Sequence, residues 1–568
     1  MSCHVKICGT VLQRLTYADK PCVGRIYGIY DNTNVTIIGL ERKIATDKNL
    51  NIFASLPVPI ESCGTFTVDN NDASNKFELG KFHVFCNFTT KEIVVESKLE
   101  NKLNEPPYEI ISDAEVFARY LMVQVKGAVP LRCEASKSSI QESFQKLKNQ
   151  ILSENVAFRI SQLSIYVLHS KVICDAEREN MTIKQLYESL NDNVHDEPNR
   201  KKKGKSVTPT ILDADLLQKL SVGEADISLN HSPVCVLNKS NKKIINTYCK
   251  INSLAMIPFD AQLSDIFKIL QIAILKYIVH YEEKFWPCFM ENTSLEIDGY
   301  HFYPPESGHF LTLLYPAVKS DQDLVTERLS LHQLLMMNEN FPMFRRANQF
   351  ISNNIEVDGP LLNPHVGVRT VDNGGNQCLV RGNYKYYHYC QNGMDDSGWG
   401  CAYRSLQTLA SWLKLQGYVD REVPTFHEIQ KCLVDIKDKP STFLGSRQWI
   451  GSTEVSFVLD TLLGITCKIL YVSSGTEISQ KGPELVDHFK NQGSPIMIGG
   501  GVLAHTILGV DYNPETGSIY FLILDPHYTG SEDLHTIQSK GWCGWKPVSF
   551  WQKDSYYNLC LPQVPRGV

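Results

Sequence analysis

The stretch that decides the fold of the C-terminal third of the chain reads Asp395-Asp396-Ser397-Gly398-Trp399-Gly400-Cys401-Ala402-Tyr403-Arg404-Ser405. Its two glycines allow a tight turn and a close approach of other backbone. Asp396 or Ser397 is expected to cap the helix that follows. That helix is indicated by one apolar face with three- and four-residue spacing, which consists of Tyr403, Leu406, Leu409, Ala410 and Leu413. The pattern therefore places Cys401 in the first turn of a helix.

The start of a helix is a position that can activate a thiol. Unpaired N–H groups and the positive end of the helix dipole lie there. Both lower the pKa of a cysteine and favour the thiolate, which is the nucleophilic form. The turn alone leaves two interpretations open: Cys401 is a nucleophile, or it is a buried and inert cysteine.

A nucleophilic cysteine needs a base, and the base needs a group that orients it. The segment Tyr520–Leu524 is an apolar run typical of a buried strand, and Asp525-Pro526-His527 follows directly. Residues two apart on an extended chain point to the same side. Pro526 restricts the backbone of Asp525 to an extended conformation. Asp525 is therefore expected to hold the ring of His527, although the same tripeptide also suits an ordinary turn at the end of a strand.

Two other residues compete for these roles. His505 follows the glycine-rich run Gly499-Gly500-Gly501 and is a rival base, but no carboxylate follows it closely. Cys543 lies between Trp542 and Gly544 and is a rival nucleophile, but no helix pattern follows it. An oxyanion hole needs a further hydrogen-bond donor, and the tyrosines in Tyr384–Tyr389 can supply a phenol, although most tyrosines only pack.

Five segments resemble the ubiquitin-fold-modifier-specific cysteine proteases in order and spacing: 396–405, 445–451, 499–506, 525–528 and 541–546. The resemblance implies an α+β fold with a papain-like protease domain. It implies Cys401, Asp525 and His527 as catalytic residues and adds a catalytic tyrosine twelve residues before the cysteine, Tyr389. No cofactor and no metal are expected.

The resemblance also implies a substrate class and partners. Such an enzyme would trim the precursor of a ubiquitin-fold modifier after a glycine and remove the modifier from lysine side chains. The glycine tail is expected to enter a narrow slot lined by Trp399, Gly499, Gly500 and Gly501, with His505 nearby. A membrane-anchored partner, the odorant-response-abnormal protein 4 homologue, would recruit the cytoplasmic enzyme to the endoplasmic reticulum. Two alternatives stay open: an autophagy-type protease for another ubiquitin-like tail, and a scaffold with an idle protease domain.

Length and composition agree with a reduced, multidomain globular protein. The chain has 568 residues, 43% of them hydrophobic, and a net charge of −6, which gives no sign of a nucleic-acid binder. Its 17 cysteines are scattered without a disulfide or zinc pattern. No apolar run reaches the length of about 20 residues that a membrane span needs. We expect three domains, with boundaries at 1–112, 113–348 and 349–568.

The first two domains show no catalytic pattern. Residues 1–112 are β-rich, with hairpins expected at Val23–Tyr30/Val35–Leu40 and Phe82–Phe88/Ile93–Val95. They faintly resemble an MPN-type domain, and His4 and His83 are too few for its zinc site, so a metal-free interaction domain is expected; a structural extension is the alternative.

The middle domain is expected to mix helices and strands. Its expected elements are a strand at Tyr120–Lys126, a helix face made by Ile140, Phe144, Leu147 and Ile151, one long strand at Ala157–Leu168, and a helix capped by Ser264 and ending near Trp286. A flexible basic loop lies near 191–210. Its run Arg200–Lys205 is expected to stay solvated, and a nuclear signal is the alternative.

Overall fold

The computed structural model describes residues 4–31, 34–44, 50–70, 81–99, 102–174, 181–193, 211–219, 242–350, 359–419 and 421–567. The chain forms two compact units. Unit 1 contains Met1–Glu339 and Gln349–Ile355, and unit 2 contains Asn340–Asn348 and Glu356–Gly567. The basic run at 200–205 lies outside the described residues. None of the described helices is both long and apolar enough to cross a membrane.

The first sheet of unit 1 has the strand order β7-β6-β5-β4-β2-β3-β1-β8. The expected hairpins are confirmed, because β2 pairs with β3 and β5 pairs with β6, both antiparallel. The strands are β1 (Val5–Cys8), β2 (Cys22–Asp31), β3 (Asn34–Arg42), β4 (Glu61–Asp69), β5 (Phe82–Asn87), β6 (Ile93–Leu99), β7 (Lys102–Asn104) and β8 (Tyr108–Ile111), and the helices beside them are α1 (Gly9–Thr16), α2 (Ile52–Ser55) and α3 (Asp113–Phe117).

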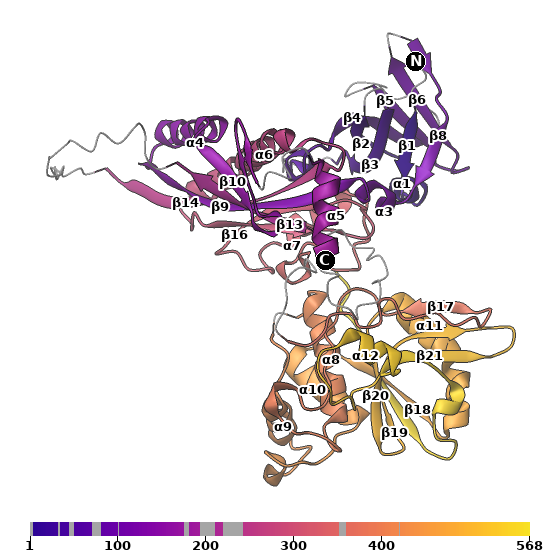
Figure 1. Cartoon of the computed structure of the whole chain (residues 1–568). Helices are drawn as coiled ribbons and strands as arrows, with labels where there is room; N and C mark the ends of the chain where they lie inside the picture. The colour runs from indigo at the N-terminus through magenta and orange to yellow at the C-terminus, as the bar shows by residue number, and fades with distance from the viewer. Residues whose placement is uncertain are drawn as a thin grey trace. The chain divides into compact units, whose positions relative to one another are not determined.

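The second sheet of unit 1 has the order β12-β11-β10-β13-β9-β14. Two helices, α4 (Lys137–Leu152) and α6 (Leu263–Met290), lie on one of its faces and share its hydrophobic core (Figure 1). The strands are β9 (Tyr120–Glu134), β10 (Val156–Ile160), β11 (Ile165–Leu168), β12 (Val172–Ile173), β13 (Ile211–Gln218) and β14 (Ile244–Pro258). The remaining elements are α5 (Ile183–Asn193), the hairpin β15 (Ile297–Phe302) with β16 (Leu311–Pro316), and α7 (Val325–Leu334).

The helix face expected on α4 is confirmed, since Ile140, Phe144, Leu147 and Ile151 are its buried residues. The single strand expected at 157–168 is wrong. The segment is a hairpin of β10 and β11, and between them the chain turns at Ser164, whose φ is 55°.

Two further boundaries in unit 1 differ from expectation. Helix α6 begins at Leu263, and Gln262 stands at its N-cap in place of Ser264. The strand expected at Tyr120–Lys126 continues to Glu134 because it pairs with β14 along its whole length.

Unit 2 is built on a sheet with the order β18-β23-β19-β20-β21-β22, and β17 also pairs with β20. The strands are β17 (Asn376–Leu379), β18 (Cys467–Val472), β19 (Ile496–Gly500), β20 (Leu503–Tyr512), β21 (Ile519–Leu524), β22 (Cys543–Pro547) and β23 (Tyr557–Pro562). The helices are α8 (Cys401–Leu415), α9 (Phe426–Asp435), α10 (Ser452–Leu463), α11 (Gly482–Asn491) and α12 (Leu534–Ser539).

The two faces of this sheet carry different cores, as the side-chain alternation of strands requires. Leu508, Leu522 and Leu524 face the core that α8, α9 and α10 complete. Ile507 and Ile523 face the opposite core, to which α11 contributes. The helix that carries Cys401 thus packs across β19 and β20, and β20 pairs with β21, the strand that leads to Asp525 and His527. This is the expected α+β, papain-like arrangement (Figure 1).

Candidate active site

Cys401 is the first residue of α8 and is buried. The expected side-chain cap is wrong: Gly400 stands at the N-cap, and no side chain caps the helix. The carboxylate of Asp396 instead pairs with Arg404, with Oδ2 2.7 Å from Nε, and it accepts the N–H of Cys390 at 2.8 Å. The ion pair is buried and fixes the turn before the cysteine.

The glycines of this turn serve two different purposes. Gly398 has a φ of 80°, which glycine adopts without strain. Gly400 has an ordinary φ, but a Cβ there would lie 2.4 Å from Oδ2 of Asp396. The second glycine is therefore required by close packing against the buried carboxylate.

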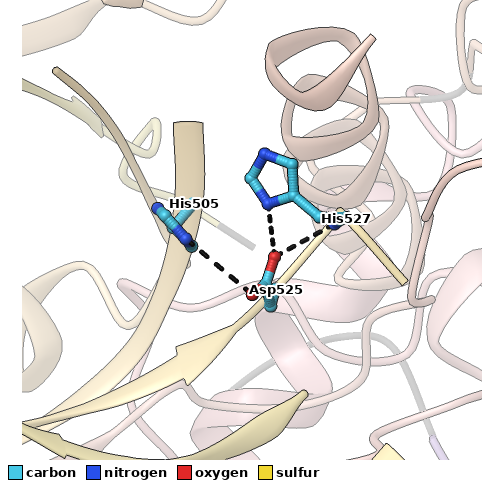
Figure 2. Close-up of side chains that lie close together, drawn as sticks. All are labelled: His505, Asp525 and His527. Carbon is cyan, nitrogen blue, oxygen red and sulfur yellow. Dashed lines mark hydrogen bonds and ion pairs between the residues drawn. The ribbon is translucent and has the colours of Figure 1, made fainter. Parts of the chain in front are cut away.

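Asp525 and His527 meet as the sequence predicts. His527 Nδ1 lies 2.5 Å from Oδ1 of Asp525, and the His527 backbone N–H donates to the same oxygen at 3.0 Å. Figure 2 shows this carboxylate between two histidines, with His505 Nε2 3.9 Å from its other oxygen. His527 therefore forms the short hydrogen bond to Asp525, whereas His505 lies next to the carboxylate at a longer distance.

Charge in the site is arranged for an ion pair between Cys401 and His527. Burial raises the pKa of the Cys401 thiol, but His527, the backbone of Ala504 and the hydroxyl of Tyr389 outweigh burial and hold this pKa below its ordinary value. Burial lowers the pKa of His527, but Asp525 and Cys401 raise it to about 9. His527 Nε2 is buried without a hydrogen-bond partner among the described residues, and catalytic pairs often tighten only when substrate binds.

The rival residues have different properties. Burial lowers the pKa of His505 to about 4, so the ring stays neutral near pH 7. Burial raises the pKa of Cys543 to about 12, which keeps this thiol protonated. The geometry therefore favours Cys401 as nucleophile and His527 as base.

Tyr389 lies beside both of these groups. Its ring meets the ring of His527 edge to face, with centroids 5.3 Å apart, and its hydroxyl contacts the Cys401 thiol. Burial and the neighbouring thiol raise the pKa of Tyr389, so the hydroxyl keeps its proton and remains a donor. The role predicted for Tyr389 in an oxyanion hole agrees with this position.

A cavity of about 220 Å³ opens at Cys401. Trp399, Gly499 and Gly500 line it, as predicted. Gly501 and His505 are not among the lining residues. Gly501 forms the turn between β19 and β20 with a φ of 56°, and the ring of His505 lies near the site, with its centroid 5.2 Å from that of His527. Further lining residues for which no role was predicted are Trp449, Val502, Leu503, Tyr556 and Asn558, and the first three belong to the segments 445–451 and 499–506. Trp449 Nε1 donates to the carbonyl of Gly398 at 3.0 Å and so holds the cavity wall to the cysteine turn.

Metal-ligating side chains converge at one place in the described part of the chain. That group is His505, Asp525 and His527, whose ligand atoms lie within 4.8 Å of one another. Two of these three residues are the acid–base pair just described.

Comparison with known proteins agrees with this geometry. Residues 375–560 match the model of Peptidase family C78. Residues 1–116 match the insect UFM1-specific protease N-terminal MPN-like domain, and residues 141–354 match the N-terminal region of ubiquitin-fold modifier 1 specific protease 2. Ufm1-specific protease 2 of Gallus gallus is 42% identical over 79% of this chain and 100% of its own length.

The chain belongs to the Ufm1-specific protease 2 family. A probable member from Drosophila melanogaster is 33% identical over 99% of both chains, so the relationship includes the N-terminal region. The crystal structure of UfSP from C. elegans superposes over the full length of both chains with a TM-score of 0.73 at 26% identity. The α+β protease with an MPN-like N-terminal domain, expected from the sequence, is thereby confirmed.

Sequence reasoning missed the residues that brace the site. Arg404 belongs to the quoted cysteine stretch, but nothing local shows that it pairs with Asp396. His388, Gln391 and Glu532 went unnoticed because their partners lie up to 144 residues away in the chain.

Proposed function

We propose that this chain is a thiol protease that cleaves after the C-terminal glycine of ubiquitin-fold modifier 1. It matures the modifier precursor and removes the modifier from lysine side chains of conjugates. One observation carries the proposal: a thiol of lowered pKa at a helix start stands beside a histidine held by a carboxylate. The family membership supplies the substrate class.

The chemistry follows from the roles of these groups. The Cys401 thiolate attacks the glycine carbonyl carbon, and the carbonyl oxygen takes up the electron pair as an oxyanion. The Cys401 amide and the Tyr389 hydroxyl stabilise that oxyanion. The intermediate collapses to a thioester when His527 gives its proton to the departing amine. Water then attacks the thioester, gives a proton to His527, and releases the glycine carboxylate and the thiol.

Selectivity for a glycine tail follows from the cavity wall. A Cβ on Gly500 would lie 2.2 Å from the carbonyl oxygen of Tyr556, so the strand can present no side chain there. Trp399 closes the same cavity next to Cys401. A tail without side chains fits such a slot, whereas a branched residue beside the scissile bond meets the wall.

The test is cleavage of the modifier precursor and of an isopeptide-linked conjugate by the full chain and by Cys401→Ser. We expect the wild type to cut both and the variant to bind precursor but cut neither, because a serine alkoxide forms far less readily than a thiolate near pH 7. A panel of other ubiquitin-like precursors separates this function from an autophagy-type specificity. Failure of the wild type to react with a modifier-tail electrophile would instead favour the scaffold with an idle protease domain.

We further propose that a membrane-anchored protein, the odorant-response-abnormal protein 4 homologue, recruits the cytoplasmic enzyme to the endoplasmic reticulum. The match of residues 1–116 to an MPN-like domain supports an interaction role for this region. The alternative is a nuclear location, for which the basic run Arg200–Lys205 would serve as the signal. Microscopy of the tagged full chain, with and without the partner, tests this proposal. Unchanged localisation after loss of the partner would contradict it.

A further inference from the structure

Gln391 lies in the 3₁₀ turn Gln391–Gly393, directly after Cys390 and between the tyrosine segment 384–389 and the helix that carries Cys401. Its side chain is buried and makes three hydrogen bonds. Oε1 accepts the backbone N–H of His388 at 3.0 Å, and Nε2 donates to the carbonyl of Tyr386 at 3.2 Å and to Glu532 Oε1 at 2.6 Å. Each partner is either only a donor or only an acceptor, so the orientation of the amide is fixed.

Glu532 ties the same segment to His388. Its Oε1 lies 3.0 Å from Nε2 of His388, and its Oε2 accepts the N–H of Leu361 at 3.2 Å. The other ring nitrogen of His388 lies 2.9 Å from the carbonyl of Tyr389 and 3.1 Å from that of Tyr528. We call the set Gln391, His388 and Glu532 the Gln391 network.

The network joins the tyrosine segment to the Asp-Pro-His turn. His388 precedes Tyr389, and Tyr528 follows His527, so the ring of His388 holds the carbonyls next to both functional side chains. Two more hydrogen bonds run in parallel: the Tyr389 N–H donates to the carbonyl of Pro526 at 2.9 Å, and the Tyr386 hydroxyl donates to the carbonyl of Asp525. These hydrogen bonds fix the tyrosine segment 384–389 and the turn at 525–528 relative to each other.

The backbone of Gln391 reaches the third part of the site. Its carbonyl accepts Nη2 of Arg404 at 3.3 Å, and Arg404 lies one turn after Cys401 on α8. The chain around Gln391 is held in an unfavourable conformation, since Cys390 and Asn392 have φ values of 61° and 58°. Such a conformation persists only where the surroundings impose it.

We propose that the Gln391 network positions Tyr389 and His527 against Cys401 for the reaction proposed above, and that Gln391 is the residue on which this alignment depends. None of its three members lines the cavity. Its loss should therefore lower kcat and leave KM unchanged, since a displacement of about 1 Å at a catalytic group can cost roughly a hundredfold in rate.

The experiment is an exchange of polar groups in the full chain between Gln391, which is buried, and Glu532, which is partly exposed. Gln391→Glu places a second carboxylate against Glu532 and against the carbonyl of Tyr386. We expect a loss of roughly ten- to a hundredfold in kcat for precursor cleavage. Glu532→Gln in the same chain restores a donor and an acceptor at the contact, and we expect kcat to recover at least about fivefold in the double variant.

Gln430→Met is the matched control for Gln391→Met. Gln430 is also a buried glutamine of unit 2 with three hydrogen bonds, all away from the tyrosine segment. Its Nε2 donates to the carbonyl of Ser446 at 2.8 Å and to the Tyr403 hydroxyl at 3.4 Å, and its Oε1 accepts the N–H of Gly445 at 2.7 Å. Both substitutions remove buried hydrogen bonds and should lower the melting temperature similarly, but only Gln391→Met should lower kcat. If Gln391→Glu does not fold, the kcat values of the two methionine variants test the proposal instead. They are measured at a temperature at which both variants are folded.

Two outcomes would overturn the proposal. One is a kcat of Gln391→Glu within about threefold of the wild type; the other is the absence of recovery in a folded double variant. Alkylation of Cys401 by iodoacetamide, measured in parallel, separates this proposal from the proposed function. A wild type that is alkylated rapidly but cuts no modifier precursor would reject the proposed function, while a slower alkylation of Gln391→Glu would still support positioning.

Discussion

At the scale of single residues, the ion pair of Cys401 and His527 determines how activity depends on pH. The pKa of His527 is raised to about 9, and that of Cys401 is lowered. Thiolate and imidazolium therefore coexist at pH values between the lowered pKa of Cys401 and about 9. We expect kcat/KM to stay level through neutral pH and to fall above about pH 9, where His527 loses the proton that the leaving amine needs.

The same shift has a consequence for stability with a definite sign. A histidine with a raised pKa stabilises the folded state fully below its ordinary value near 6.5, and this contribution is lost as pH rises through about 9. His527→Gln should remove that dependence from the unfolding free energy.

For the activity profile, a kcat/KM that already falls at pH 7 would contradict the assignment of Cys401 and His527 as a thiolate–imidazolium pair.

Tyr389 gives a second prediction at this scale. If its hydroxyl stabilises the oxyanion, Tyr389→Phe should lower kcat by roughly 10²–10³ and leave KM little changed, since the bond strengthens only when charge develops. Steady-state cleavage of the precursor measures this effect. Tyr387→Phe is the control, because the neighbouring Tyr386 is unsuitable: its hydroxyl donates to the carbonyl of Asp525. A loss smaller than about threefold would assign Tyr389 to packing alone.

At the scale of elements, the turn before α8 is the most demanding part of the chain. Gly400→Ala would place a methyl carbon 2.4 Å from Oδ2 of Asp396, which is itself held by Arg404. The turn must shift, and we expect a loss of about 1–3 kcal/mol in unfolding free energy together with lowered kcat. Chemical denaturation and precursor cleavage measure the two effects.

Gly445→Ala is the comparison for this prediction. Gly445 has a φ of 76° and nothing within 4 Å of an added Cβ, so it tests backbone strain without a clash. Equal kcat for Gly400→Ala and the wild type would show that the turn yields without disturbing the cysteine.

Predictions from the sequence were correct where the pattern is local. They failed where a residue far away in the chain determines which group a side chain contacts. The apolar spacing of α4 predicted its buried face correctly, because the face that a helix buries recurs with the helical period. For α8 the spacing predicted the helix, but not that every residue from Cys401 to Leu413 is buried, polar residues included. Asp396 suited a helix cap, but Arg404, one turn after Cys401 on α8, takes its carboxylate instead. The pairing of Asp525 with His527 was predictable because side chains two residues apart on an extended chain point to the same side, whatever the rest of the fold. Glu532 and Gln391, 141 residues apart, give no such signal.

At the scale of the whole molecule, the predicted catalytic residues all come from unit 2. A chain that begins at Asn340 should therefore cleave soluble precursor with a kcat within about threefold of the full chain. Kinetic comparison of the two proteins tests this, and an inactive but folded fragment would show that unit 1 takes part in catalysis.

Removal of residues 1–112 alone should have a different effect. The buried guanidinium of Arg14 on α1 donates to the carbonyls of Leu335 and Ser307 at 3.0 and 3.1 Å. Deletion removes both hydrogen bonds and exposes the two carbonyls to water; a hydrogen bond to a charged group contributes about 1.5–3 kcal/mol to stability. The shorter deletion should thus melt at a lower temperature than the full chain, as calorimetry would show.

The link between Gln391 and Glu532 also bears on how the enzyme is made. The segments that carry Tyr389 and His527 leave the ribosome far apart in time, since the contacts that join them span 137 to 144 residues. Contacts of such high sequence separation are slow to form, because the loop must close before they stabilise anything. The segment with Cys401 is therefore synthesised before its base. Labelling of Cys401 by a modifier-tail electrophile during refolding should lag behind the recovery of helical circular dichroism, and we expect a chain that ends before His527 to remain unlabelled.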